Sequence, residues 1–218
     1  MMFQDRRAAG QALAGLLEPL RSRPETVVLA LPRGGVPVAF EVARHLDLPL
    51  DVFIVRKLGV PGQEELAMGA IASGGATVLN AGVIADLSIP AALIEQVASR
   101  EHLEVERREL AYRDGLAPLK IDGLTVILVD DGIATGASVR AAVRALQPRV
   151  REIFVAVPVV SVSTCDRLAS EVDHVVSVVT PRTYGSVGMY YHNFSQTTDE
   201  EVRLLLSQAR SEATPTAA

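Results

Sequence analysis

Short runs of apolar, mostly β-branched residues recur along the chain, at 26–31, 50–55, 125–130, 153–158 and 174–179. They do not alternate with polar residues, so both faces of each predicted strand should be covered. Segments with helical periodicity follow three of the runs, at 36–46, 137–147 and 162–171. This alternation predicts an α/β fold, a doubly wound and mostly parallel sheet flanked by helices.

Two segments interrupt the alternation. Residues 66–80 have the pattern of two strands joined by Ser-Gly-Gly, which predicts a hairpin. Residues 90–115 have long helical periodicity and a charged face, which we expect to be solvated and to carry i,i+4 ion pairs. That charged face consists of Glu101, Glu104, Glu106, Arg107, Arg108 and Glu109. Hairpin and helix together predict an insertion at 60–120 that could cover a site.

The ends of the chain differ from its middle. Helically spaced apolar residues follow the charged start at Asp5. Aromatic residues gather at 180–197, and the TTDEEV stretch after them resembles an N-cap followed by acids, which predicts a last helix. We therefore expect a single domain over 1–210 with a small C-terminal hood at 180–197. The small, polar stretch 211–218 is expected to be a disordered tail.

Composition narrows the class of protein. The 218 residues suffice for a substantial core. The net charge of -5 argues against a general nucleic-acid binder. The single cysteine, Cys165, excludes an internal disulfide and a CxxC site. Neither a signal-peptide core nor an apolar run of membrane-spanning length is visible. These features predict a soluble, cytoplasmic protein with no nucleic-acid and no membrane partner.

The stretch VILVDDGIATGAS, residues 126–138, carries the clearest chemistry. Asp130 and Asp131 stand at the carboxyl end of a predicted strand, where open parallel sheets bind ligands. The Gly/Thr/Ser loop then enters a helix, so its amides and the hydroxyls of Thr135 and Ser138 can donate to an anion. No lysine follows the second glycine, which disfavours a nucleotide-triphosphate P-loop. A simple turn capped by aspartates is the alternative.

The complete arrangement resembles the phosphoribosyl diphosphate (PRPP) signature of the type I phosphoribosyltransferases. The resemblance implies that Asp130 and Asp131 accept the 2- and 3-hydroxyls of ribose. It implies a 5-phosphate cradle made of Ile133, Ala134, Thr135, Gly136, Ala137 and Ser138. It also implies a Mg²⁺ ion held chiefly by the ligand, with the two acids contributing only indirectly through ligand and water. Family members that act on hypoxanthine and guanine carry an acid at the position of Ala134, so this loop offers no general base.

Two further stretches match the family. LPRGGVPVA, residues 31–39, stands where the family has its diphosphate loop, often with a non-proline cis peptide, here expected at Pro32–Arg33. Arg33, Gly34 and Gly35 would meet the diphosphate, although a plain Gly-Gly turn is the alternative. In VRKLG, which we take as the end of the second strand, Arg56 and Lys57 stand where members have a basic pair. They would stabilise the leaving diphosphate, although a surface basic pair is the alternative.

These matches imply an enzyme of nucleotide metabolism or salvage that transfers phosphoribosyl from PRPP to a nitrogenous acceptor. The catalytic set would be Asp130, Asp131, Arg33 and Lys57, with Glu65 as a candidate base or merely a solvated acid. The acceptor would bind under the hood, where aromatic side chains can stack on a heterocycle, although core packing or a dimer contact would also explain them. The hood aromatics are Tyr184, Tyr190, Tyr191 and Phe194.

The whole chain is similar to a bacterial group of phosphoribosyltransferase-like proteins that share its ELAMGAIA segment and its tyrosine-rich tail. Two other functions remain open, a PRPP-sensing regulator without turnover and a phosphate-ester hydrolase. A regulator would usually add a DNA-binding motif or a basic RNA-binding face, and neither is visible. A flavodoxin-like response domain is disfavoured by the second glycine loop. By analogy with the fold, a homodimer is expected.

Overall fold

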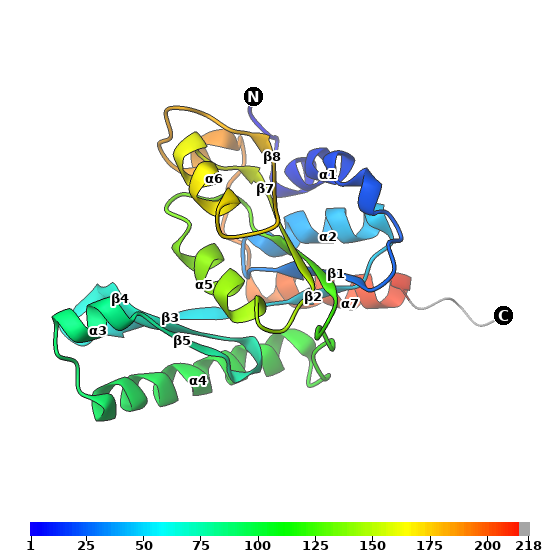
Figure 1. Ribbon diagram of the computed structural model, residues 1–218. Helices are drawn as coiled ribbons and strands as arrows, with labels where there is room; N and C mark the ends of the chain where they lie inside the picture. The colour runs from blue at the N-terminus through cyan, green and yellow to red at the C-terminus, as the bar shows by residue number, and fades with distance from the viewer. Residues whose placement is uncertain (214–218) are drawn as a thin grey trace.

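The computed structural model describes residues 1–213, apart from the side chains of residues 64, 65 and 213. Its centre is a five-stranded sheet in the order β2-β1-β6-β7-β8, and every neighbouring pair is parallel (Figure 1). The strands are β1 (Thr26–Ala30), β2 (Leu50–Val52), β6 (Thr125–Val129), β7 (Glu152–Val159) and β8 (His174–Val179). The predicted doubly wound α/β fold is confirmed.

Helices cover both faces of this sheet. One face carries α1 (Arg6–Leu16), α2 (Gly35–Leu46) and α7 (Asp199–Ala213) (Figure 1). The other carries α5 (Ala137–Leu146) and α6 (Val162–Ala169). Helix α7 reaches three residues into the stretch expected to be a tail, and the rest of that stretch, 214–218, lies outside the described residues.

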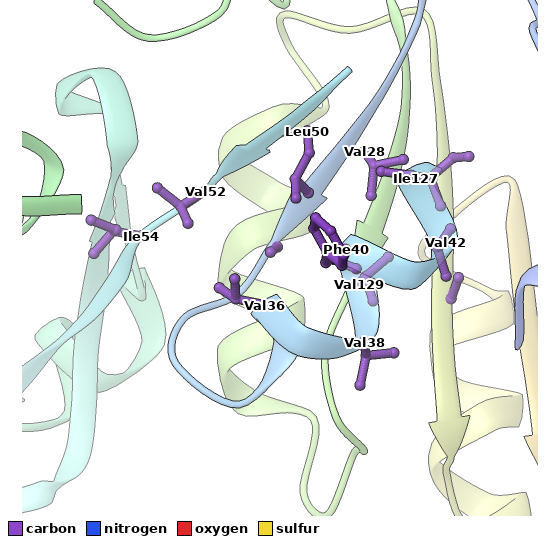
Figure 2. Close-up of a cluster of buried hydrophobic side chains, with 14 of the residues drawn as sticks. Val28, Val36, Val38, Phe40, Val42, Leu50, Val52, Ile54, Ile127 and Val129 are labelled. Atoms are coloured by element: carbon purple, nitrogen blue, oxygen red, sulfur yellow. The ribbon is translucent and has the colours of Figure 1, made fainter. Parts of the chain in front are cut away.

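The uninterrupted apolar runs follow from this double cover. In β1, Val28 points to the core under α2, whereas Val27 and Leu29 point to the core under α5. Figure 2 shows Phe40 of α2 lying against the strand residues of the core under α2. Since each buried aliphatic side chain is worth about 1.5–3 kcal/mol, a polar residue on either face of β1 would be costly.

The insertion forms a second, antiparallel sheet in the order β3-β4-β5, packed along a long helix. Its elements are β3 (Val55–Val60), β4 (Gln63–Ala72), β5 (Thr77–Leu79), α3 (Ala81–Asp86) and α4 (Ala91–Arg113). The hairpin prediction is confirmed, since β4 and β5 pair across the turn Ser73–Gly75. In Figure 1 these elements project from the main body as an arm.

The predicted second strand is in fact two strands in different sheets. Strand β2 ends at Val52, and the amide of Phe53 still donates to Ala30 of the main sheet at 2.9 Å. The next amide, that of Ile54, donates to the hydroxyl of Ser73 in the insertion at 2.8 Å. The VRKLG stretch therefore begins the arm, and the expectation that it ends a parallel strand is wrong.

The charged face of α4 is only partly solvated. Glu104 pairs with Arg107 and Arg108, and their hydrogen bonds lower the pKa of Glu104 to about 2. Glu101 differs, because it is 7% exposed and accepts from Arg56 of β3 at 2.8 Å. The expectation of a solvated face is wrong for Glu101, because strand β3 of the arm packs against this side of α4. Among the described residues, no helix combines the length and apolarity needed to cross a membrane.

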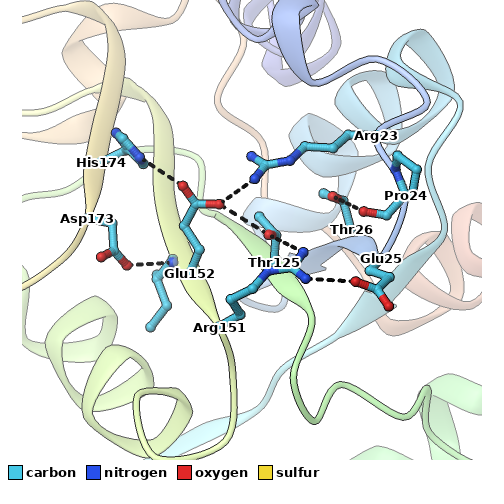
Figure 3. Close-up of polar contacts among 10 residues, drawn as sticks. Arg23, Pro24, Glu25, Thr26, Thr125, Arg151, Glu152, Asp173 and His174 are labelled. Carbon is cyan, nitrogen blue, oxygen red and sulfur yellow. Dashed lines mark hydrogen bonds and ion pairs between the residues drawn. The ribbon is translucent and has the colours of Figure 1, made fainter.

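Polar contacts join the amino ends of the strands, at the edge of the sheet away from the motifs (Figure 3). Glu152 accepts from Arg23 at 2.8 Å and from Thr125 at 3.2 Å, and His174 Nε2 lies 3.1 Å from its second oxygen. Burial alone would raise the pKa of Glu152, but His174, Arg23 and Thr125 outweigh it and lower the pKa. The ionised carboxylate is thus the form that the folded state prefers.

We expect Glu152→Gln to lower the free energy of unfolding at pH 7 by about 1 kcal/mol. A carboxyl whose folded pKa is depressed stabilises above its unfolded pKa and loses that contribution as pH falls through the folded value. The gap between wild type and variant should therefore close below about pH 4 in urea titrations. Glu25→Gln is the control, because Glu25 is mostly exposed beside Arg151 and should change little. If the difference in free energy of unfolding between wild type and Glu152→Gln is the same at all pH values, the pKa of Glu152 is not lowered in the folded protein.

Candidate functional site

The loops after β1 and β6 meet at one edge of the sheet. From β1 the chain continues to β2 on one side, and from β6 it continues to β7 on the other. The connecting helices α2 and α5 cover opposite faces, so the strand order reverses between β1 and β6. Ligands of open α/β sheets bind in the crevice at such a switch point.

The acid pair lies at this switch point, directly after β6. The amide of Asp131 donates to Asp130 Oδ1 at 2.8 Å, and both side chains are largely withdrawn from solvent. Burial, and then the neighbouring charge of Asp131, raises the pKa of Asp130 well above its usual range. Burial also raises the pKa of Asp131, although a hydrogen bond from Arg6 opposes the rise. Two carboxylates with few partners at a strand end suit hydroxyl or cation ligands.

The glycine loop after β1 packs directly against these acids. A Cβ atom added to Gly34 would lie 2.0 Å from Asp131 Oδ2, and one added to Gly35 would lie 2.7 Å from the carbonyl oxygen of Val129. Only glycine permits this approach, because real contacts of a Cβ are not that short. The Pro32–Arg33 peptide is cis, as expected from the family resemblance. The two motifs, about a hundred residues apart in sequence, therefore form one surface.

The loop after the acids leads into α5 as the sequence indicated. Gly136 precedes the helix with φ +79, a conformation that favours glycine. Ala134, Thr135, Ala137 and Ser138 are exposed at the loop and the first turn, where helix amides lack intrahelical acceptors. Ile133 differs, because its side chain is buried and its amide donates to Val159 at 2.9 Å. It anchors the loop and does not contribute its amide to the cradle.

Two of the basic residues predicted at the site, Arg33 and Arg56, are held by carboxylates. Arg33 lies 3.7 Å from Asp199 at the start of α7, and Arg56 is paired with Glu101 of α4. Lys57 is exposed on β3. The guanidinium groups of Arg33 and Arg56 thus pair with carboxylates other than Asp130 and Asp131. The side chain of Glu65, the predicted base, lies outside the described residues.

The aromatic residues of the hood divide into two groups. Tyr191 is buried, packs against Phe3 and donates its hydroxyl to the backbone oxygen of Asp131. This hydrogen bond fixes the backbone of the acid loop. Because its ring is buried, Tyr191 is not placed to stack on an acceptor, contrary to the expectation for the hood aromatics. Tyr184 stacks on Tyr190 with ring centroids 5.7 Å apart. The Tyr184 hydroxyl is buried without a hydrogen-bond partner in the described residues, and burial raises its pKa to about 12.

Comparison with known proteins agrees with this geometry. The family model described as a phosphoribosyl transferase domain matches residues 2–193. The chain belongs to the phosphoribosyltransferase family. Proteins of two Mycobacterium tuberculosis strains, CDC 1551 and H37Rv, named as candidate phosphoribosyl transferases, are each 44% identical over 209 residues. That stretch covers 95% of this chain but 47% of theirs, so the chain spans about half the length of these relatives.

A solved structure has the same architecture. The crystal structure of TT1426 from Thermus thermophilus is 42% identical, with a TM-score of 0.84. The match covers 95% of this chain and 99% of that one. The arm and the hood thus belong to a shared architecture, since the match spans nearly all of both chains.

The acid pair of this phosphoribosyltransferase domain suits magnesium. Mg²⁺ keeps several waters and takes one or two carboxylates together with substrate phosphates. Asp130 and Asp131 supply two carboxylates beside two glycine loops. Among the described residues, no group of three His, Cys, Asp or Glu side chains forms a cage for a metal by itself. Asp130 and Asp131 are therefore ligands of the kind that a magnesium ion takes.

One residue of the phosphoribosyltransferase site was not predicted. Arg6, the first residue of α1, places Nε 2.8 Å from Asp131 Oδ2. The sequence does contain a signal for it, because Arg6 and Arg7 open a helix that has no acid in its first turn. Cations are unfavourable at a helix N-terminus, so arginine there is expected to have a tertiary partner.

Proposed function

We propose that this domain binds PRPP with Mg²⁺ and transfers its phosphoribosyl group to a nitrogenous acceptor, a nucleobase or similar heterocycle, with release of diphosphate. The observation that carries the proposal is the packing of Gly34 and Gly35 against the acid pair, because the loop that we assign to the diphosphate then lies beside the acids that we assign to the ribose. In the reaction the bond from ribose C1 to the diphosphate oxygen breaks. A bond from C1 to the acceptor nitrogen forms, and that nitrogen loses a proton.

Each part of the crevice has a role in this proposal. Asp130 and Asp131 accept hydrogen bonds from the ribose hydroxyls and fix the sugar, so that C1 faces the acceptor. The exposed amides before and within the first turn of α5 bind the 5-phosphate. When bound, Mg²⁺ supplies positive charge that stabilises the departing diphosphate. The catalytic role of Glu65 stays a prediction, as does a homodimer, which light scattering would test.

The basic residues can join the site when the ligand binds. The pair between Arg33 and Asp199 is 3.7 Å long and well exposed, and such pairs contribute little to stability. The Arg33 guanidinium can therefore turn to a diphosphate, which offers two parallel acceptors. In this proposal Lys57, exposed on the arm strand β3, also contacts the diphosphate. Arg56 contributes less directly, because buried Glu101 holds it in the arm.

We assign Tyr184 to the acceptor site, because a buried hydroxyl without a partner calls for an explanation and a bound ligand would supply the missing hydrogen bond. We expect Tyr184→Phe to leave the free protein equally stable or slightly more stable, since it removes an unsatisfied polar group. The same change should raise the KM for the acceptor by about tenfold and leave PRPP affinity unchanged, because one hydrogen bond is lost only in the acceptor complex. Steady-state kinetics and thermal melts measure both effects.

Tyr190→Phe is the matched control. Its hydroxyl makes a 3.4 Å contact with the backbone oxygen of Thr183 and has no role with the acceptor in this proposal. Equal acceptor KM values in wild type and Tyr184→Phe would remove Tyr184 from the acceptor site.

The proposed function is tested by titrating PRPP into the protein by calorimetry, with and without Mg²⁺. A diphosphate-release assay against purines, pyrimidines and small amines follows. Magnesium-dependent binding with acceptor-dependent release is the expected result. Binding without release would indicate a PRPP sensor, and release of phosphate without any acceptor would indicate a hydrolase. Absence of binding would overturn the assignment of the crevice.

A further inference from the structure

Arg6 connects the acid pair to the hood. Its Nε donates to Asp131 Oδ2 at 2.8 Å and its Nη1 donates to the backbone oxygen of Ser195 at 2.6 Å. The guanidinium carbon lies 3.9 Å from the centroid of the Phe194 ring. The Arg6 side chain is only 12% exposed. Three contacts from two distant segments therefore hold one guanidinium in place.

These contacts restrain the Asp131 carboxylate. The backbone of Gly34 packs against the Asp131 carboxylate, and Arg6 holds the same Oδ2 atom by an ion pair, so two distant segments set the orientation of this carboxylate. Asp131 has two oxygens and about four lone-pair sites, so it can keep Arg6 on Oδ2 and still accept a hydroxyl from a ligand. The planar guanidinium of Arg6, stacked on the Phe194 ring, presents its N–H donors in a fixed direction to Asp131, which the rotatable ammonium of a lysine would not do.

The neighbouring arginine provides a contrast. Arg7 is 64% exposed and pairs with Glu41 of α2, whose side chain is 2% exposed. The two residues are adjacent in the first turn of the same helix, and they carry the same charge. Of these two arginines, Arg6 pairs with Asp131, whereas Arg7 pairs with Glu41.

We propose that Arg6 is a positioning residue of the sugar site, which orients Asp131 toward a ribose hydroxyl and ties it to the hood at Phe194 and Ser195. The inference rests on the proposed function, in that the ligand is taken to be a ribose phosphate. It goes beyond that function, because it assigns recognition of the sugar, as distinct from the diphosphate, to a residue outside the three motifs. A ligand without ribose should not depend on Arg6 in the same way.

The test compares Arg6→Gln, Arg6→Lys and the control Arg7→Gln by calorimetry with Mg²⁺. The probes are PRPP, ribose 5-phosphate and inorganic diphosphate. Arg6→Gln should weaken PRPP and ribose 5-phosphate by about 10- to 100-fold, the range for one hydrogen bond to a charged group. Its affinity for inorganic diphosphate should change by less than about threefold, because that probe has no hydroxyl for Asp131. Arg6→Lys should recover part of the loss, and Arg7→Gln should match wild type with every probe.

The outcomes separate the two levels of the proposal. If wild type binds none of the probes, the proposed function fails and this inference fails with it. If wild type binds them but Arg6→Gln retains full affinity for ribose 5-phosphate, only the role of Arg6 is overturned. Equal losses for ribose 5-phosphate and diphosphate would also overturn it, because they would indicate a general effect of charge or structure. If Arg6→Gln does not fold, the same comparison of probes with Arg6→Lys decides.

Discussion

Replacing Gly34 with alanine should reduce PRPP affinity at least about 100-fold while the domain stays folded. The added Cβ atom would lie 2.0 Å from Asp131 Oδ2 and 2.7 Å from its carboxyl carbon. Gly34 itself has φ -59 and ψ -32, which alanine adopts readily, so the expected effect is a collision and not backbone strain. Because Arg6 holds the same Oδ2 atom of Asp131, a shift of the carboxylate away from the added Cβ atom would disturb that ion pair. Calorimetric titration of PRPP with Mg²⁺ measures the loss.

Gly15→Ala is the matched control for this prediction. Gly15 lies in α1, and a Cβ atom added there meets nothing within 4 Å. Glycine is the poorer helix former by about 1 kcal/mol, so this variant should be slightly more stable and bind PRPP like wild type. Wild-type affinity in a folded Gly34→Ala protein would mean that the loop after β1 and the acid pair do not bind one ligand.

Replacing Asp130 with asparagine should stabilise the free protein at neutral pH and abolish its magnesium-dependent binding of PRPP. Burial and then the charge of Asp131 raise the pKa of Asp130, so ionising it in the folded state costs free energy. An asparagine side chain keeps an oxygen that can accept from the Asp131 amide, as Asp130 Oδ1 does at 2.8 Å. A gain of about 1 kcal/mol, or roughly 2–4 °C in Tm, is the scale to expect.

The direction of the pH effect follows from proton linkage. Between the unfolded and the raised folded pKa, the folded state of wild type binds more protons than the unfolded state, so its stability falls as pH rises. The advantage of Asp130→Asn should therefore be small near pH 4 and grow toward neutral pH. Thermal melts across that range measure it. If Asp130→Asn is less stable than wild type at pH 7, the ionised Asp130 carboxylate is well satisfied in the folded protein and its pKa is not raised.

The two predictions describe a site that sacrifices stability for function. Burial raises the pKa of both acids although Arg6 pairs with Asp131, and the close approach of Gly34 and Gly35 leaves no room for a side chain. Functional sites often retain such unfavourable features, because the ligand provides the missing partners. Ribose hydroxyls and a magnesium ion are suitable partners for carboxylates of this kind.

Local pattern was sufficient for much of the architecture. The uninterrupted apolar runs predicted buried parallel strands, and the helical periods between them predicted α2, α5 and α6. The Ser-Gly-Gly turn predicted the β4–β5 hairpin, since Gly74 and Gly75 adopt positive φ values of 76 and 79. Each of these features depends on residues close to one another in the chain.

Prediction from sequence failed where the structure of a segment depends on contacts with residues far away in the chain. Residues 50–55 resemble one strand, but Phe53 bonds to the main sheet and Ile54 bonds to Ser73 in the arm. In the sequence Glu101 resembles any exposed acid of a charged helix, but in the fold it is buried and paired with Arg56 of β3. The sequence groups Tyr191 with the other hood aromatics as an acceptor contact or a packing residue, but its hydroxyl bonds to the backbone of Asp131.

The sequence by itself determined the fold class, the two glycine loops, the acid pair and the family to which they are similar. These are encoded in contiguous patterns, because strand burial, turn chemistry and helix starts depend on neighbouring residues. Only the tertiary structure decided that Gly34 touches Asp131, that Arg6 holds the same carboxylate, and that the Tyr184 hydroxyl is left without a partner in the described part of the chain. Such contacts join residues far apart in the chain, and only packing of the whole fold sets the distances between them.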